Sequence, residues 1–147
     1  MRKSAGWTLG VCVFAAQAII GGCGGGKGVG PSGTGLADIE LRVPASVTDG
    51  IALVVVTGGT VRTVQTAGPQ FRAVGEDTPT TQVIARGTFT GSAVKLATIC
   101  IDNIEDLGSF QVAVIQVAGG QAAGHALRDA AAYTATLTNP RTAASCP

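Results

Sequence analysis

The chain has 147 residues, a formal net charge of +1 and an aromatic content of only 4%. A charge this close to zero gives no electrostatic case for nucleic-acid binding, because affinity for phosphate backbones needs a clustered basic surface. One histidine supplies neither a catalytic triad nor a zinc site, so the chain is short of catalytic residues from the outset.

The amino terminus has the zones of an export signal. Arg2 and Lys3 form a positive n-region. Residues 7–20 follow as an uncharged, largely apolar stretch of about 14 residues, within the ~7–15 typical of signal peptides. This stretch is shorter than the ~20 residues that a membrane-spanning helix needs. The sequence therefore predicts a signal peptide over residues 1–22.

Four residues, Ile20-Gly21-Gly22-Cys23, end this leader. They resemble the lipobox of bacterial lipoproteins, with Ile20 where leucine is usual and Cys23 at the invariant position. The resemblance implies a lipoprotein in which Cys23 carries a diacylglyceryl thioether and becomes an acylated amino terminus, with acyl chains such as palmitate. Two or more chains give stable anchoring to a membrane. An ordinary secretory signal with an incidental cysteine is the alternative.

The region after Cys23 is a Gly-rich tether that extends to residue 35, with almost no apolar side chain to bury. Gly24 stands where an aspartate would signal inner-membrane retention in enteric bacteria. The lipoprotein resemblance therefore implies a cell-envelope location, in the outer membrane and facing the periplasm or the cell surface.

Residues 36–147 are expected to form one domain with period-two patterning. Ile39, Leu41 and Val43 alternate with charged residues, as in a half-buried strand. Strands are expected at 39–43, 51–56, 61–66, 71–74, 82–89, 93–101, 110–117 and 133–137, with one helical segment at 121–131. Without long helical intervals, these segments predict an all-β fold, an antiparallel Ig-like β-sandwich of about seven or eight strands.

The order of the apolar runs, with 52–56 early and 91–96 midway, resembles the layout of cohesin-type sandwiches over roughly residues 38–138. The resemblance implies a cohesin-like fold. It does not carry a cohesin's dockerin partner to this chain, because a shared fold does not imply a shared function.

Two cysteines remain once Cys12 leaves with the leader and Cys23 carries lipid. These are Cys100, at the end of an expected core strand, and Cys146, next to last. An oxidising compartment favours a disulfide between them, which would fix the carboxyl terminus to the sandwich. A buried thiol and a frayed end are the alternative. Pro140 is expected to end the final strand, so the tail from about residue 139 would depend on the bridge.

One acidic cluster lies between two predicted strands and contains Asp102, Asn103, Glu105 and Asp106. Oxygen ligands in a tight loop could hold calcium, although the spacing is not that of an EF-hand. Turns also favour Asp and Asn for backbone reasons, so a solvated turn is the other interpretation.

Catalytic candidates are few. His125 has no cysteine or acidic residue at ligand spacing, and the adjacent Glu76 and Asp77 would point opposite ways on a strand. We therefore expect neither catalytic residues nor a cofactor, and the sequence favours a noncatalytic binding module with an unidentified protein partner. A structural role in an envelope assembly, using flat sheet edges, is the alternative, and a small hydrolase is less favoured.

Overall fold

Nine strands and two 3-10 helices make up the part of the chain that the computed structural model describes, residues 33–44, 49–89, 93–120 and 124–147. All of these residues belong to the unit Pro31–Pro147. The strands are β1 (Thr34–Arg42), β2 (Asp49–Thr57), β3 (Thr63–Thr66), β4 (Phe71–Val74), β5 (Thr81–Thr88), β6 (Val94–Ile101), β7 (Gln111–Gly119), β8 (Leu127–Arg128) and β9 (Thr134–Ala143). The helices are η1 (Ile104–Ser109) and η3 (Ala130–Ala132). The segment expected to be a signal peptide, Cys23 and most of the expected tether lie outside the described residues.

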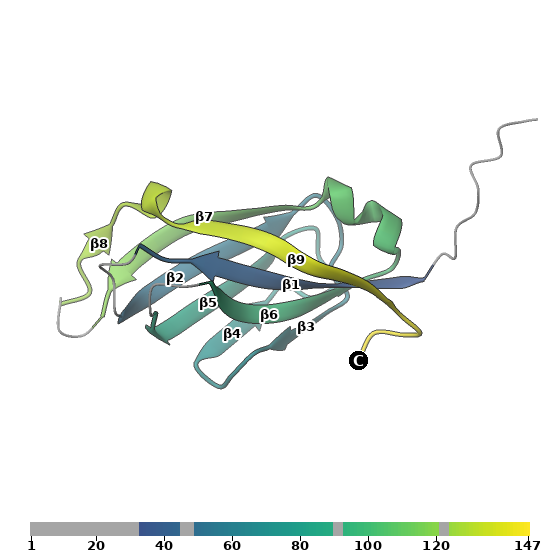
Figure 1. Cartoon of the computed structure of the whole chain (residues 1–147), viewed down its shortest axis with the longest axis horizontal. Coiled ribbons are helices and arrows are strands. Elements are labelled where there is room, and N and C mark those ends of the chain that lie inside the picture. The colour runs from purple at the N-terminus through teal and green to yellow at the C-terminus, as the bar shows by residue number, and fades with distance from the viewer. Residues whose placement is uncertain (1–32, 45–48, 90–92, 121–123) are drawn as a thin grey trace, which may run out of the picture. The chain divides into compact units, whose positions relative to one another are not determined.

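The strands form two antiparallel sheets, as the sequence predicts for a sandwich. One sheet has four strands in the order β3-β6-β1-β9, and the other has five in the order β4-β5-β2-β7-β8. Figure 1 shows them as two layers, with β9, β1 and β6 side by side in one and β7, β2, β5 and β4 in the other. The all-β sandwich is thus confirmed, with nine strands instead of seven or eight.

Strand alternation builds the core between the two sheets. Ile39 and Leu41 of β1 are fully buried, as are Val54 and Val56 of β2. In each strand these residues are two apart, so their side chains point to the same side of the sheet. The core is therefore made by one face of each sheet, and the other face of each sheet points outward.

The prediction of a helical segment at 121–131 is wrong for its described part, residues 124–131. Its described part holds a turn at Gly124 and His125, the two-residue strand β8, and the start of η3. His125 and Gly124 both have positive φ, at 57° and 63°, which breaks a helix at this point. The alanine content favours a helix locally, but pairing of β8 with Val117 and Ala118 of β7 prevails.

The final strand is longer than predicted, because β9 continues through Pro140 to Ala143. The register between β1 and β9 shifts at this point, and Asn139, with φ of 50°, and Pro140 occupy the irregularity between Thr138 and Arg141. β9 is also an edge strand, where proline is tolerated because it breaks no ladder on the open side. The strand at the amino end, β1, begins at Thr34, five residues before the expected strand start at Ile39, so the last two residues of the expected tether belong to it.

Candidate interaction surface

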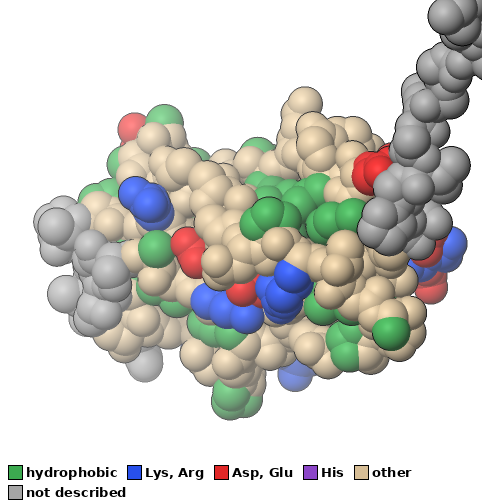
Figure 2. Space-filling view, turned by 45° about the vertical axis from the view of Figure 1, so that its right-hand side comes forward, with side chains coloured by type: hydrophobic (Ala, Val, Ile, Leu, Met, Phe, Trp, Pro, Cys, Tyr) green, Lys and Arg blue, Asp and Glu red, His purple; other side chains and the backbone are tan. Residues whose placement is uncertain are grey.

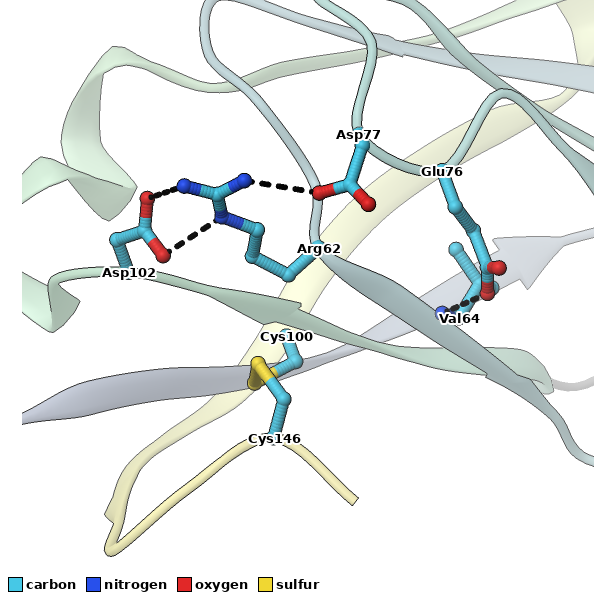
Figure 3. Close-up of a disulfide and its surroundings, with 7 residues drawn as sticks. All are labelled: Arg62, Val64, Glu76, Asp77, Cys100, Asp102 and Cys146. Carbon is cyan, nitrogen blue, oxygen red and sulfur yellow. Dashed lines mark hydrogen bonds and ion pairs between the residues drawn. A yellow bond between two sulfur atoms is a disulfide. The ribbon is translucent and has the colours of Figure 1, made fainter.

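Arg62 pairs with Asp102, one member of the predicted acidic cluster, and with Asp77, which lies outside that cluster (Figure 3). Its Nε and one terminal nitrogen donate to the two carboxylate oxygens of Asp102, both at 2.8 Å, and its other terminal nitrogen donates to Asp77 at 2.9 Å. Hydrogen bonding to Arg62 lowers the pKa of the Asp102 carboxyl, and the two carboxylates raise the pKa of Arg62. Asp102 is therefore a partner of arginine in this structure.

The other calcium candidates begin η1. Asn103 is the N-cap, and its side-chain oxygen accepts a hydrogen bond from the backbone N–H of Glu105 at 3.1 Å. Glu105 and Asp106 are exposed in the first turn, where acidic residues suit the helix dipole. Within the described ranges, no group of three or more His, Cys, Asp or Glu side chains comes together as a metal-binding set. The arrangement is that of a capped turn.

Glu76 protects a sheet edge. Its Oε1 accepts a hydrogen bond at 2.8 Å from the backbone N–H of Val64 in β3, an edge strand of the four-stranded sheet (Figure 3). Asp77, the next residue, has φ of 56° and pairs with Arg62. Both residues lie in the turn after β4, so neither is positioned with the other for acid–base chemistry.

The predicted disulfide is present. Cys100 and Cys146 are bonded, with their Cα atoms 5.6 Å apart, and Cys100 is almost completely buried. Cys100 lies on the side of β6 that faces away from the core, next to Leu36 of β1. The tail after β9 therefore folds back over the outside of the four-stranded sheet, as Figure 3 shows.

Asp38 is the charged centre of that outer surface, and sequence reasoning did not single it out. It stands in β1 opposite Thr98 of β6, and its side chain is only 7% exposed. Thr98 Oγ1 donates to Asp38 Oδ1 at 2.7 Å, and Lys95 Nζ lies 3.0 Å from the same oxygen. The buried carboxylate is thus bound by one hydroxyl and one ammonium group from a single neighbouring strand.

β9 supplies the remaining partners of Asp38. Asn139 Nδ2 donates to Oδ2 at 3.2 Å, and both terminal nitrogens of Arg141 donate to Oδ1 at 3.2 Å. Burial alone raises the pKa of Asp38, but the hydrogen bonds from Thr98, Lys95 and Asn139 outweigh it and hold the pKa at about 2. In Figure 2, two groups of Lys and Arg side chains flank acidic atoms near the middle of the molecule.

We call the outward side of β3, β6, β1 and β9 the polar face. Charged and hydroxyl side chains dominate it, and its centre is the Asp38 network. Its outward members include Asp38, Glu40, Arg42, Lys95, Thr98, Thr134, Thr136 and Arg141. The charge of Asp38 is thus neutralised by partners on the same face, and the disulfide covers the end of the surface, while the buried hydroxyls of Thr63 and Thr138 have no hydrogen-bond partner.

The outward side of the other sheet differs in kind. Among the residues whose side chains the structure describes, four large hydrophobic ones are exposed, and all four lie in the strands of this sheet: Val74 of β4 at 57%, Ile84 of β5 at 37%, Ile115 of β7 at 56% and Leu127 of β8 at 72%. Single exposed aliphatic residues are normal on a protein surface, but these four all lie on the same outward face of one sheet.

The central strand β2 completes this surface. Ala52, Val54 and Val56 are fully buried in the core, so Ile51, Leu53 and Val55 point outward, where they are half-buried. In register, Leu53 stands opposite Ile84 of β5 and Gln116 of β7, with the extra residue Ile115 in the bulge beside Gln116. We call the outward side of β4, β5, β2, β7 and β8 the apolar face, with members Ile51, Leu53, Val55, Val74, Ile84, Ile115 and Leu127.

The polar residues of the apolar face differ between the two flanks of its central strand β2. Arg72 of β4 and Arg86 of β5 lie on one flank of β2, and Gln111 and Gln116 of β7 lie on the other. No Asp or Glu stands at an outward position of these strands among the residues whose side chains the structure describes. The apolar face is therefore aliphatic in the middle, basic on one side and neutral on the other.

A second open feature lies where β7 and β9 approach each other. An apolar groove of about 410 Å³ is lined by Leu107, Phe110 and Val112 on one side and by Ala135 and Leu137 on the other. β8 pairs only with Val117 and Ala118, so the stretch 111–116 of β7 has no neighbour on that side among the described strands. This open side, seen in Figure 2 with hydrophobic side chains gathered near the upper centre, is an exposed strand edge.

His125 is exposed in the turn before β8, and its Nδ1 lies 3.2 Å from the carbonyl oxygen of Gly119. It lines a pocket of about 230 Å³ together with Arg86 and Thr88, and among the described residues it belongs to no group of three or more His, Cys, Asp or Glu side chains that could hold a metal ion. None of the described helices is long and apolar enough to cross a membrane.

Comparison with known proteins finds no matching family model, no matching curated protein and no matching solved structure. The lipobox resemblance and the cohesin-like layout therefore stay predictions from the sequence.

Proposed function

We propose that the chain is a noncatalytic interaction module of the cell envelope, attached to a membrane through a lipid on Cys23. The lipobox-like end of the leader supports the anchor, and the Gly-rich stretch after it supports a flexible tether. The charged residues singled out in the sequence support a noncatalytic role, because Asp77, Asp102 and Glu76 hold turns and strands of the fold.

The observation that carries the proposal is the apolar face. Burying apolar surface contributes roughly 25 cal/mol per Å², so an aliphatic sheet face left in water represents free energy available to a binding partner. The side chains of β2 are aliphatic on both its outward and its inward face, which is typical of strands covered on both faces. In this domain only the inward face of β2 is covered by the other sheet.

The open edge of β7 favours a related role as a structural component of an envelope assembly. Residues 111–116 are neutral, rich in β-branched side chains and free of proline, and they have no strand neighbour on their outer side among the described strands. Such an edge is able to accept another strand. The open edge and the apolar face both include β7, so a partner bound at one would lie next to the other.

The anchor is tested by replacing Cys23 with Ser. The parent protein should partition into the detergent phase, and the C23S variant should be exported but found in the aqueous phase. Retention of the variant in the detergent phase, with normal processing, would refute lipidation of Cys23.

The interaction role is tested by the native size of the protein released from its own envelope in mild detergent. The parent should migrate as a complex larger than one chain, and Ile115→Glu, which places a charge on the apolar face, should reduce that size. The matched control is Thr134→Glu on the polar face, which should leave the size unchanged. If Ile115→Glu leaves the complex intact, or if the parent is already a single chain, the apolar face is not an interaction surface.

A further inference from the structure

We infer that the apolar face binds the apolar face of a second copy of this chain, in a two-fold symmetric dimer with β2 of each copy at its centre. The inference rests on the proposed interaction role of this face, and it names the partner. Flat antiparallel sheets pack face to face with their strands nearly aligned, at about 10 Å.

The strand order makes the face self-complementary. β2 is the middle strand of five, so a two-fold axis along β2 places β5 of one copy over β7 of the other and β4 over β8. Positions along the strands are kept by such an axis. Leu53 therefore meets Leu53 on the axis, and Ile84, which is opposite Leu53 in the sheet, meets Gln116 of the second copy, with the bulge residue Ile115 beside it.

The polar groups fit the same axis. By the register, Arg86 would lie over Ala118 of the second copy, and Arg72 would lie beside the Gln116 that meets Ile84, so neither arginine faces an arginine. A guanidinium group donates hydrogen bonds and an amide oxygen accepts them, so Arg72 is compatible with Gln116 as a neighbour. The symmetric arrangement thus separates the like charges and buries the aliphatic centre.

The area of the face matches what a dimer needs. Five strands about 4.8 Å apart and about six residues long, at ~3.4 Å each, give a plane of roughly 24 by 20 Å. Two such planes cover roughly 1,000 Å², the lower limit for a specific interface. Tethering both copies to one membrane would raise their effective concentration and favour so small an interface.

A lipid surface fits the face less well. Side chains that anchor proteins at membrane interfaces are mainly Trp and Tyr. The described aromatic residues Phe71, Phe89 and Tyr133 are buried, and Phe110 is half-buried beside the groove. The aliphatic character of the face, without exposed aromatic side chains among its described residues, is closer to that of a sheet-to-sheet contact.

The first experiment is disulfide cross-linking of the exported full chain carrying C23S, so that it is not held to the membrane. In this background, Leu53→Cys should form a covalent dimer under mild oxidation, because the two thiols face each other across the axis. The control Thr134→Cys, on the polar face, should stay monomeric. A monomeric Leu53→Cys protein with an intact Cys100–Cys146 bridge would overturn the symmetric dimer.

The second experiment is a charge-pair rescue followed by sedimentation velocity, which needs no new cysteine. Ile84→Lys and Ile115→Glu should each shift the C23S protein from dimer to monomer. The double variant should regain the dimer, because the ammonium group introduced at position 84 of one copy would then lie beside the carboxylate introduced at position 115, in the bulge of β7 of the other. Failure of the double variant to restore the dimer, while circular dichroism shows a folded sandwich, would overturn the proposed register.

The outcomes separate this inference from the proposed function. If the C23S protein is monomeric at every concentration but the complex from the envelope still depends on Ile115, the partner is a different protein and the dimer is wrong. If Ile115→Glu changes neither the envelope complex nor the sedimentation, both the dimer and the interaction role of the face fail.

Discussion

The outward faces of the two sheets of this sandwich differ in their side chains and in how far the chain itself provides partners for them. The polar face carries a buried carboxylate, Asp38, together with the cations, hydroxyls and amide that bind it, and a disulfide-linked tail covers one end. The apolar face carries aliphatic side chains, four of them exposed, with arginine and glutamine at its flanks. The charge at the centre of the polar face finds its partners within one chain, whereas the apolar face has hydrophobic surface left to bury.

The difference shows which residues serve the fold and which are left for function. Every contact of Asp38 connects β1 to a neighbouring strand of the same sheet, so the network stabilises the domain. The aliphatic residues Ile115 and Leu127 of the apolar face are largely exposed, and their removal should change the domain little. Substitutions on the two faces should therefore separate stability from association.

The largest expected effect is loss of the disulfide on the polar face. Cys146→Ser should lower the free energy of unfolding by up to about 4 kcal/mol, the chain-entropy figure for a loop of 46 residues. Residues 144–147 should gain hydrogen exchange, while β9 stays protected through Arg141 and its bonds to Asp38. Chemical denaturation and amide exchange measure both. A variant that unfolds at the same denaturant concentration as its parent would show that the bridge does not stabilise the polar face.

The next effect comes from the centre of the same face. Asp38→Asn keeps the shape but leaves Lys95 and Arg141 without the carboxylate, and should cost about 2 kcal/mol at neutral pH, the equivalent of lowering a pKa from 3.8 to about 2. Because the folded pKa is lower than the unfolded one, this stability is present above about pH 4 and is lost as the pH falls toward 2. Chemical denaturation over this range should show the parent and the variant converging.

The control for Asp38 is Glu40→Gln, two residues along the same strand and on the same face. This variant should lose much less stability than Asp38→Asn at neutral pH, because its carboxylate is not at the centre of the network. Equal losses for the two variants would indicate a general charge effect and not a specific network.

On the apolar face, Leu127→Ser should leave stability almost unchanged, within about 0.5 kcal/mol, as is usual for exposed positions. Leu127 is the most exposed of the four aliphatic residues, at 72%. The same variant should weaken association, which sedimentation velocity measures in parallel with thermal unfolding. A large loss of stability without a change in association would mean that this side chain serves the fold.

The smallest effect is expected at Arg62, which joins the turns of Asp77 and Asp102 at the surface. Arg62→Gln should lower the melting temperature slightly at low salt and less at high salt, because exposed ion pairs are weak and screened. A decrease as large as that of Asp38→Asn would contradict the surface character of this cluster.

Much of the fold could be predicted from the sequence, because alternation in β1 and the apolar runs of β2 and β6 report burial directly. The disulfide was predicted from the number of cysteines and from the oxidising compartment that the leader implies. The segment 121–131 failed because its alanines favour a helix locally, while pairing with β7 decided its structure. The prediction that Pro140 ends the final strand failed because β9 is an edge strand with an irregular register at this point, where proline is tolerated.

The surfaces were harder to predict than the core. Asp38 takes its partners from positions up to 103 residues away, and nothing local marks it apart from a charge within a strand. The apolar run of β2 predicted a core strand, but a sequence does not show which of its two faces the same chain covers. That requires the strand order, which places only one sheet face against the core.

The most direct test of the difference between the faces is thiol labelling in the intact envelope. Single cysteines at Ile115 on the apolar face and at Thr134 on the polar face would be reacted with a membrane-impermeant maleimide after the outer membrane is made permeable. Purified monomeric protein gives the reference rate for each. We predict that Ile115→Cys is protected in the envelope relative to the purified protein, whereas Thr134→Cys reacts equally in both. Equal reactivity of Ile115→Cys in both states would contradict a covered apolar face.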